Sequence, residues 1–321
     1  MNTVPRLTIG LPVYNGQDFL PQALDALLGQ SFRDFELIIS DNASTDGTEE
    51  ICRRYAAKDD RVHYHRQPRN LGISENHNVL VRLARGALFK WAGHDDLFGE
   101  DLLRRCVGLL DDHPDAVLAT CWTAMIDDTD RVTEVVTRYP LASDSPRPAE
   151  RYRGLLHAVT GDDDYGVIRV EALRATPLLD SYYHADRALV AELALHGKFL
   201  RIPEPLYFRR DLPDRASRSS AQQHAQVVRD WCVKHDPRRA DRRRHPTARL
   251  LTEYLWAFFA GIGRAPIPAA DKRACYRELV GYLAGRALRR ATPPPLEAVP
   301  EVDPATIDVA ALVPSRKRLP R

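Results

Sequence analysis

The sequence predicts a doubly wound α/β domain, with a mostly parallel sheet and helices on both faces, followed by a helical region. Short apolar runs alternate with stretches of helical periodicity through the first 120 residues. The connections between them are short, which favours parallel strands joined by right-handed crossovers. Beyond about residue 211 the chain changes character, and helical stretches follow. A chain of 321 residues with 44% hydrophobic content has room for one large domain or two ordinary ones.

Five strands and four helices are expected in this first part. The strands fall at residues 7–11, 35–40, 61–65, 88–92 and 117–121, and the helices at 19–28, 48–57, 74–85 and 100–112. The strands are short apolar runs, whereas the helices repeat apolar residues at a spacing of three or four. Asp46 with Glu49, and later Ser74, are expected to cap the second and third helices.

The pattern is less regular further along the chain. An edge strand is expected at 132–136, a Pro- and Ser-rich loop at 144–149 and a helix at 186–196, followed by helices at 220–234, 247–261 and 270–290. The tail from residue 292 is rich in proline, so we expect it to be poorly ordered.

Composition argues against several classes of protein. The net charge is only +2, so no nucleic-acid partner is expected. No apolar segment follows a basic stretch at the N-terminus, and no window reaches the about 18 apolar residues that span a bilayer. The five cysteines are scattered and never paired at a metal spacing. We therefore expect a reduced, cytoplasmic protein.

Two contacts of the helical region are left open. Its basic run contains Arg238, Arg239, Arg242, Arg243 and Arg244. This run can touch anionic lipid head groups at the inner face of the membrane, or it can be a solvated connection between helices. The helices with Trp231, Trp256, Phe258 and Phe259 can cover the first domain or form a homodimer contact.

Polar segments directly follow three of the predicted strands. They lie at residues 12–15, 40–42 and 93–96. Ligands of doubly wound sheets bind beyond the carboxyl ends of the strands, so these segments are expected to meet along one edge.

The last of these segments contains two carboxylates, Asp95 and Asp96. Carboxylate oxygens suit a divalent cation such as Mg²⁺ or Mn²⁺, which is commonly shared with substrate phosphates. The alternative is that either aspartate caps the next helix. Asp41 can likewise accept a hydrogen bond from a base N–H, or belong to an ordinary polar loop.

The combination of motifs is more specific than any single one. They are LPVYN (11–15), SDNASTDGT (40–48), NLGISENHN (70–78), ARGALFKWAGHDD (84–96), HADRALVAELALHGKF (184–199) and PEPLYFRR (203–210). Together they resemble the family-2 glycosyltransferases of the GT-A fold, over about two-thirds of the chain. The resemblance implies inverting transfer of a sugar from a nucleotide diphosphate sugar, with UDP- or dTDP-sugars favoured, to an acceptor hydroxyl of a saccharide or small molecule.

The resemblance also implies roles for individual residues. The nucleotide side would comprise Pro12, Val13, Tyr14, Asn15, Asp41, Asn42, Asn70, Gly72, His77 and His94. Asp95, with Asp96 beside it, would hold the divalent cation. Asp186 would be the general base, although its carboxylate also suits the N-terminal end of a helix. The GT-A domain would occupy residues 1–215, with a nucleotide-binding half to about 120 and an acceptor-binding half beyond it, before the helical region 216–291 and the tail 292–321.

Two positions depart from the family pattern. Gly93 stands where the family usually has an aspartate, so a cation would lose one ligand, and water or His94 would replace it. His77 stands where an arginine is common, either as a neutral contact to the nucleotide or as a polar helix residue. The acidic run 162–164 lies where the family has acceptor loops, or is simply a solvated loop.

Two rival functions remain. A nucleotidylyltransferase shares a similar sheet, but it needs a glycine-rich, basic first loop, and PVYNGQD has no lysine or arginine. A non-catalytic nucleotide-sugar binding or scaffold protein would have no reason to keep Asp41, Asp95 and Asp186.

Overall fold

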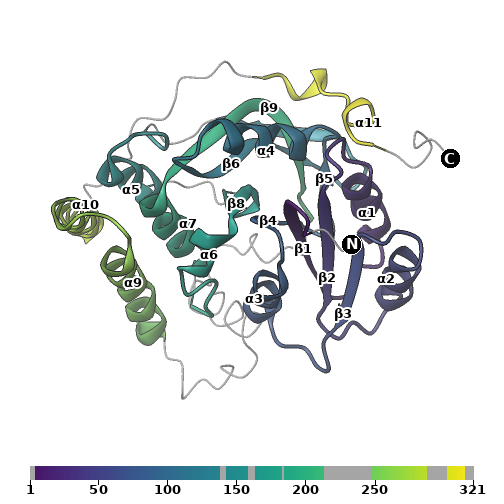
Figure 1. The fold of residues 1–321 in the computed structure, drawn as a ribbon, viewed down its shortest axis with the longest axis horizontal. Coiled ribbons are helices and arrows are strands. Elements are labelled where there is room, and N and C mark those ends of the chain that lie inside the picture. The colour runs from purple at the N-terminus through teal and green to yellow at the C-terminus, as the bar shows by residue number, and fades with distance from the viewer. Residues whose placement is uncertain are drawn as a thin grey trace.

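The chain up to Arg210 contains a nine-stranded sheet with helices on both faces (Figure 1). The computed structural model describes residues 4–137, 142–157, 163–182, 184–212, 247–287 and 302–314. The strand order is β3-β2-β1-β4-β8-β6-β9-β5, and β7 pairs with β6 beside this path. The α/β class and the doubly wound arrangement predicted from the sequence are confirmed.

The first four strands are parallel and carry the polar segments. They are β1 (Leu7–Val13), β2 (Phe35–Asp41), β3 (Val62–Arg66) and β4 (Leu88–Trp91), connected through α1 (Leu20–Leu28), α2 (Thr48–Ala56) and α3 (Ile73–Leu83). In register, Val13 pairs with Asp41, and Asp41 pairs with Arg66. The carboxyl ends of β1, β2 and β3 therefore lie side by side.

The rest of the sheet is mixed. It contains β5 (Leu97–Phe98), β6 (Ala116–Ile126), β7 (Val132–Val136), β8 (Val167–Arg169) and β9 (Lys198–Arg210). The long strands β6 and β9 are parallel, whereas β8 lies antiparallel between β4 and β6. The strands β5 and β7 are also antiparallel to their neighbours. The strand β7 confirms the edge strand predicted at residues 132–136.

Alternating strand side chains divide the core into two layers. Leu37 and Ile39 pack on the face covered by α1, α2 and α4 (Leu102–Asp112). Ile38 points to the other face, which is covered by α3, α6 (Val170–Arg174) and α7 (Ala185–His196). Burial on both faces explains why these strands read as continuous apolar runs.

A third apolar cluster joins the C-terminal helices to the sheet domain. It unites α5 (Pro148–His157) and α7 with α9 (Thr247–Arg264) and α10 (Ala269–Ala287), as Figure 1 shows. Arg264 of α9 donates two hydrogen bonds, of 3.0 and 2.8 Å, to the buried carboxylate of Glu192 on α7. The expected helix 220–234 and the basic run 238–244 lie outside the described residues.

The expectation of a poorly ordered tail is wrong for residues 302–314. They form η5 (Pro304–Thr306) and α11 (Val309–Leu312), which lie beside α1 in Figure 1. Val309 is buried in the core, and the carbonyl of Leu312 accepts a hydrogen bond from the Glu100 amide at 2.8 Å. Proline content alone therefore gave a wrong prediction of disorder for a segment that also carries apolar residues. No helix in the described ranges is long and apolar enough to cross a membrane.

Candidate functional site

The three polar segments meet at the carboxyl ends of the parallel strands, as the topology predicted. The amide of Asn42, after β2, donates to the carbonyl of Val13 at 2.8 Å. The amide of Ala92, after β4, donates to the carbonyl of Gly10 at 2.9 Å. Pro12 and Val13 themselves belong to β1, and the Val13 side chain is buried in the core. Tyr14 is the first exposed side chain beyond the strand.

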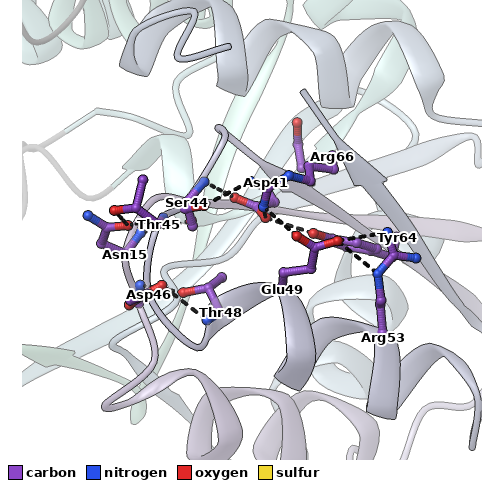
Figure 2. A network of polar contacts seen from close by, with 12 residues as sticks. Asn15, Asp41, Ser44, Thr45, Asp46, Thr48, Glu49, Arg53, Tyr64 and Arg66 are labelled. Carbon is purple, nitrogen blue, oxygen red and sulfur yellow. Dashed lines mark hydrogen bonds and ion pairs between the residues drawn. The ribbon is translucent and has the colours of Figure 1, made fainter. Parts of the chain in front are cut away.

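The loops after β1 and β2 are joined by reciprocal hydrogen bonds (Figure 2). The Asn15 amide donates to the Ser44 hydroxyl, and the Thr45 amide donates to the Asn15 side-chain oxygen, both at 2.9 Å. Asn15 and Ala43 adopt left-handed conformations, with φ of 52° and 63°. Such conformations persist where the surroundings determine them, and they gather at functional sites.

Asp41 lies at the predicted strand end. Its carboxylate is fully buried and accepts hydrogen bonds from three donors (Figure 2). It accepts hydrogen bonds from the Ser44 amide at 2.8 Å, the Tyr64 hydroxyl at 2.7 Å and the Arg66 guanidinium at 3.0 Å. Burial, together with this bond to Asp41, raises the pKa of Tyr64. A nucleotide base that donates a hydrogen bond to Asp41 would therefore share this carboxylate with the three donors. Arg66 was not singled out from the sequence, although a charged residue ending a strand was a signal.

Asn42 holds the segment before α3. Its side-chain oxygen accepts a hydrogen bond from the Leu71 amide at 2.7 Å, and its amide group donates to the side chain of Asn70 at 3.0 Å. Gly72 has φ of 88°, a backbone conformation that is strained for residues other than glycine. The helix α3 begins at the next residue, Ile73. The predicted cap at Ser74 is wrong, because Ser74 belongs to the first turn of α3 and its hydroxyl donates to the carbonyl of Asp180 at 2.9 Å.

His77 faces the segment that follows β4. Burial, with a smaller contribution from nearby His94, lowers the pKa of His77 to about 4. Its Nδ1 lies 2.8 Å from the carbonyl of Ile73, and its ring centroid lies 6.2 Å from that of Trp91. The imidazole is therefore neutral near pH 7, which fits a neutral contact as well as a purely structural role.

The Gly93–Asp96 segment packs against the first loop. A Cβ on Gly16 would lie only 2.5 Å from Cδ2 of His94, so the imidazole rests directly on this glycine. Asp96 is fully buried, and its carboxylate accepts hydrogen bonds from the Tyr207 hydroxyl at 2.6 Å and from the Arg210 amide at 3.0 Å. Asp95 is 9% exposed. Of the two residues, Asp95 is the less completely buried.

Arg210 holds the turn at Asp95 in place, a function that sequence reasoning missed. Its guanidinium is fully buried and donates to the carbonyls of Asp95 at 2.9 Å and Asp127 at 2.7 Å. It also forms an ion pair with Asp130 at 2.6 Å. An arginine is suited to this place because its fork of donors can satisfy several fixed acceptors.

The missing aspartate at position 93 has a steric explanation. A Cβ on Gly93 would overlap the Asp96 carboxylate, whose Cγ would be 2.8 Å away, and would lie 3.2 Å from Oδ1 of Asp95. The Asp96 side chain therefore occupies the space that a side chain on residue 93 would need.

The protein groups suit a cation that is shared with a ligand. Among the described residues, no three His, Cys, Asp or Glu side chains form a group that could hold a metal ion by themselves. Asp95 offers hard carboxylate oxygens and is less completely buried than Asp96, and Mg²⁺ or Mn²⁺ completes such shells with phosphate and water. The residues present therefore fit a cation bound together with a diphosphate.

The helix α7 begins directly after His184, which is left-handed with φ of 61°, and carries Asp186 in its first turn. The segment before this helix rests on α3, where the Asn78 side chain donates to the carbonyl of Leu179 at 2.7 Å. The helix α3 follows the loop held by Asn42, and α7 covers the same face of the sheet as α3. Of the acidic run, Asp162 lies outside the described residues, and the Asp164 side chain is buried.

Comparisons with known proteins agree with this architecture. The family model for glycosyl transferase family 2 matches residues 8–175. The uncharacterized glycosyltransferase RT0329 of Rickettsia typhi is 30% identical over 125 residues, which are 38% of this chain and 38% of that protein. The chain spans between 18% and 50% of the length of the curated relatives it matches first.

Two groups of solved structures share the fold. Staphylococcus aureus TarS 1–349 in complex with UDP-GlcNAc superposes with a TM-score of 0.54 at 15% identity, over 89% of this chain and 88% of that one. The mannosyltransferase PcManGT from Pyrobaculum calidifontis, in complex with GDP-Man and Mn²⁺, gives 0.51 at 21% identity, over 89% and 84%. These likenesses show the GT-A fold, and the family model covers more than half of the sequence. The chain therefore belongs to glycosyl transferase family 2.

Proposed function

We propose that this protein transfers a sugar from a nucleoside diphosphate sugar to an acceptor hydroxyl, with inversion at the anomeric carbon. Family membership supports the reaction class, and the related folds that hold UDP-GlcNAc and GDP-Man support the donor class. The observation that carries the proposal is the hydrogen-bonded union of the loops after β1 and β2, with the Gly93–Asp96 segment packed against them through His94 and Gly16.

On the donor side, this edge offers the groups that a nucleotide needs. Tyr14 presents an exposed ring, and the loops around Asn15 and Asn42 present backbone groups in fixed positions. Asp95 would hold a divalent cation together with the diphosphate of the donor. When bound, such a cation supplies charge neutralisation for the departing nucleoside diphosphate.

On the acceptor side, Asp186 would act as general base. The acceptor oxygen forms its bond to the anomeric carbon while the bond from that carbon to the diphosphate oxygen breaks. The acceptor proton passes to the Asp186 carboxylate, and the nucleoside diphosphate leaves. A base within hydrogen-bond reach of the attacking hydroxyl typically contributes about 100- to 10,000-fold in rate.

A binding screen tests the donor class. Thermal unfolding is measured with UDP, dTDP and GDP, each with and without Mn²⁺, because a ligand of the native state raises stability by mass action. We expect uridine or thymidine diphosphate to raise the melting temperature, and Mn²⁺ to increase that effect. Absence of any shift at millimolar nucleotide would contradict the proposed donor site.

The base role of Asp186 is tested by Asp186→Asn, with Asp60→Asn as a matched control at an exposed carboxylate before β3. We expect Asp186→Asn to lower the rate of sugar release from the donor by at least about 100-fold, while nucleotide affinity changes by less than about 2-fold. The control should match the wild type in both. An equal loss of nucleotide affinity in Asp186→Asn would assign this residue to binding instead.

A further inference from the structure

A lysine is buried in β4, the strand that precedes the Gly93–Asp96 segment. Lys90 lies on β4 and is 1% exposed, although lysine is almost never fully buried without partners. Its ammonium donates a hydrogen bond to the backbone carbonyl of Tyr165 in η1 (Asp163–Tyr165). It also lies 5.3 Å from the ring centroid of Tyr207 and 5.5 Å from that of Phe98.

These rings form a continuous stack. Tyr207 stacks on Phe98 at 5.9 Å and 18°, and on Tyr165 at 5.9 Å and 15°. The Tyr207 hydroxyl in turn donates to the carboxylate of Asp96. The Lys90 ammonium thus faces the ring that holds Asp96, and it binds the backbone of η1.

Several groups near Lys90 act against the effect of its burial. Burial lowers the pKa of the Lys90 ammonium, and Cys106, Cys121, Asp96 and Asp164 oppose this shift. Asp96 belongs to the segment after β4, whereas Asp164 lies in η1, which also packs against α7. A buried cation without such partners would be strongly unfavourable.

We propose that Lys90 is a positioning residue that fixes η1 against the Gly93–Asp96 segment and so sets the spacing between the donor side and the Asp186 side of the site. Its consequence for catalysis rests on the proposed function. Lys90 acts through the Tyr165 carbonyl and the Tyr207 ring. Displacement of a reacting group by about 1 Å can lower a rate by about 100-fold, so this spacing would affect turnover more than donor binding.

Hydrogen exchange of the protein alone provides the first test. The variants are Lys90→Met, Lys90→Arg and, as a packing control, Cys106→Ala, which removes a buried sulfur near the ammonium and keeps the hydrogen bond between Lys90 and Tyr165. We expect Lys90→Met to speed amide exchange in η1 and in the Gly93–Asp96 segment by at least about 10-fold, with β1 and β2 unchanged. Lys90→Arg should restore part of the protection, and Cys106→Ala should leave it intact. Unchanged exchange of η1 in Lys90→Met would overturn the inference.

Turnover provides the second test. UDP-GlcNAc and GDP-mannose are supplied separately with Mn²⁺, and hydrolysis is followed for whichever donor the wild type cleaves. Lys90→Met should lower kcat by about 10- to 100-fold while KM changes by less than about 2-fold, and Lys90→Arg should recover part of kcat. An increase in KM with kcat unchanged would overturn the positioning role. If the wild type cleaves neither donor, that result counts against the proposed function, and exchange in η1 still decides whether Lys90 fixes this segment.

Lys90→Gln covers the case in which Lys90→Met does not fold. Glutamine keeps a hydrogen-bond donor but removes the charge. We therefore expect amide exchange in η1 to be faster than in the wild type, but slower than after complete loss of the hydrogen bond to the Tyr165 carbonyl. Exchange equal to that of the wild type would overturn the role given to the charge.

Discussion

Two carboxylates share the Arg66 guanidinium, and they differ in burial. Asp41 has a fully buried side chain, whereas the Glu49 side chain is 37% exposed. Asp41→Asn would remove the charge that faces Arg66 and would place an amide where Ser44, Tyr64 and Arg66 all donate. We expect it to lower the free energy of unfolding by about 2–4 kcal/mol, measured by urea denaturation, because buried donors lose their acceptor.

Glu49→Gln is the matched control, because it weakens the other contact of the same guanidinium. An exposed ion pair typically contributes less than about 1 kcal/mol, so its effect should be small. Equal costs for the two variants would show that burial of Asp41 does not set the strength of its hydrogen bonds.

His77 makes the folded protein sensitive to acid. Its pKa is lowered by burial to about 4 from an ordinary value of 6.5, so the folded state binds this proton less well than the unfolded state. The contribution to stability is therefore complete above about pH 6.5 and falls as the pH drops toward 4, by on the order of 1 kcal/mol per pH unit. His77→Gln cannot take up the proton. Between pH 7 and pH 5 we expect its melting temperature to fall less than that of the wild type, and parallel curves would contradict this.

At the scale of elements, continuous apolar runs made β1, β2 and β4 predictable, because burial on both faces leaves a strong sequence signal. The short strands β5 and β8 have only two and three residues, too few to show a period. In β9, Pro203 and Pro205 obscured a long strand that shifts register beside them. Proline is otherwise rare within sheets.

The candidate site was predictable in position and less so in its contacts. The order of strands and loops brings residues 12–15, 40–42 and 93–96 to one edge of the sheet. This placement does not depend on the contacts that their side chains make. The partners of these side chains come from distant positions: Arg210 is 115 residues from Asp95, whose carbonyl it binds. No local pattern encodes such a pair, so Arg210 and Lys90 were assigned only from the structure.

The turn before Asp95 tolerates no side chain at its first position. Gly93→Ala would push against the Asp96 carboxylate, which Tyr207 and Arg210 hold in place. We expect a loss of about 1–3 kcal/mol in stability and a clear loss of the Mn²⁺-dependent shift in melting temperature. Gly93→Asp, although it restores the residue usual in the family, should be at least as harmful and should add no metal affinity.

Gly108 on α4 provides the control for this substitution. A Cβ there would meet nothing within 4 Å, and alanine favours a helix over glycine. Gly108→Ala should therefore be neutral, or stabilising by up to about 1 kcal/mol. Tighter Mn²⁺ binding in Gly93→Asp would show that Asp96 yields the space and that the glycine is no steric requirement.

At the scale of the whole molecule, two C-terminal parts brace the sheet domain at different places. The helices α9 and α10 pack on α5 and α7, so they support the helix that carries Asp186. Residues 302–314 instead pack on β7 through η5, and near the end of α1 and the start of α4 through Pro314 beside Gly29 and the hydrogen bond between Leu312 and Glu100. Since α1 runs back from the carboxyl edge of β1, the contacts at Gly29 and Glu100 lie at the edge of the sheet opposite the candidate site.

A chain ending at residue 301 tests that separation. It loses the burial of Val309 and the backbone bond to Glu100, which together should cost about 2–4 kcal/mol and lower the melting temperature by roughly 5–15 °C. Nucleotide affinity in the presence of Mn²⁺ should change by less than about 2-fold, because no contact made by residues 302–314 at Gly29 or Glu100 reaches the loops after β1, β2 or β4. Val309→Asp in the full chain should reproduce the loss of stability, since it places an unpaired carboxylate among apolar side chains. If truncation abolished nucleotide binding while the sheet domain stayed folded, the C-terminal segment would have to act on the site itself, and its role would be more than that of a structural brace.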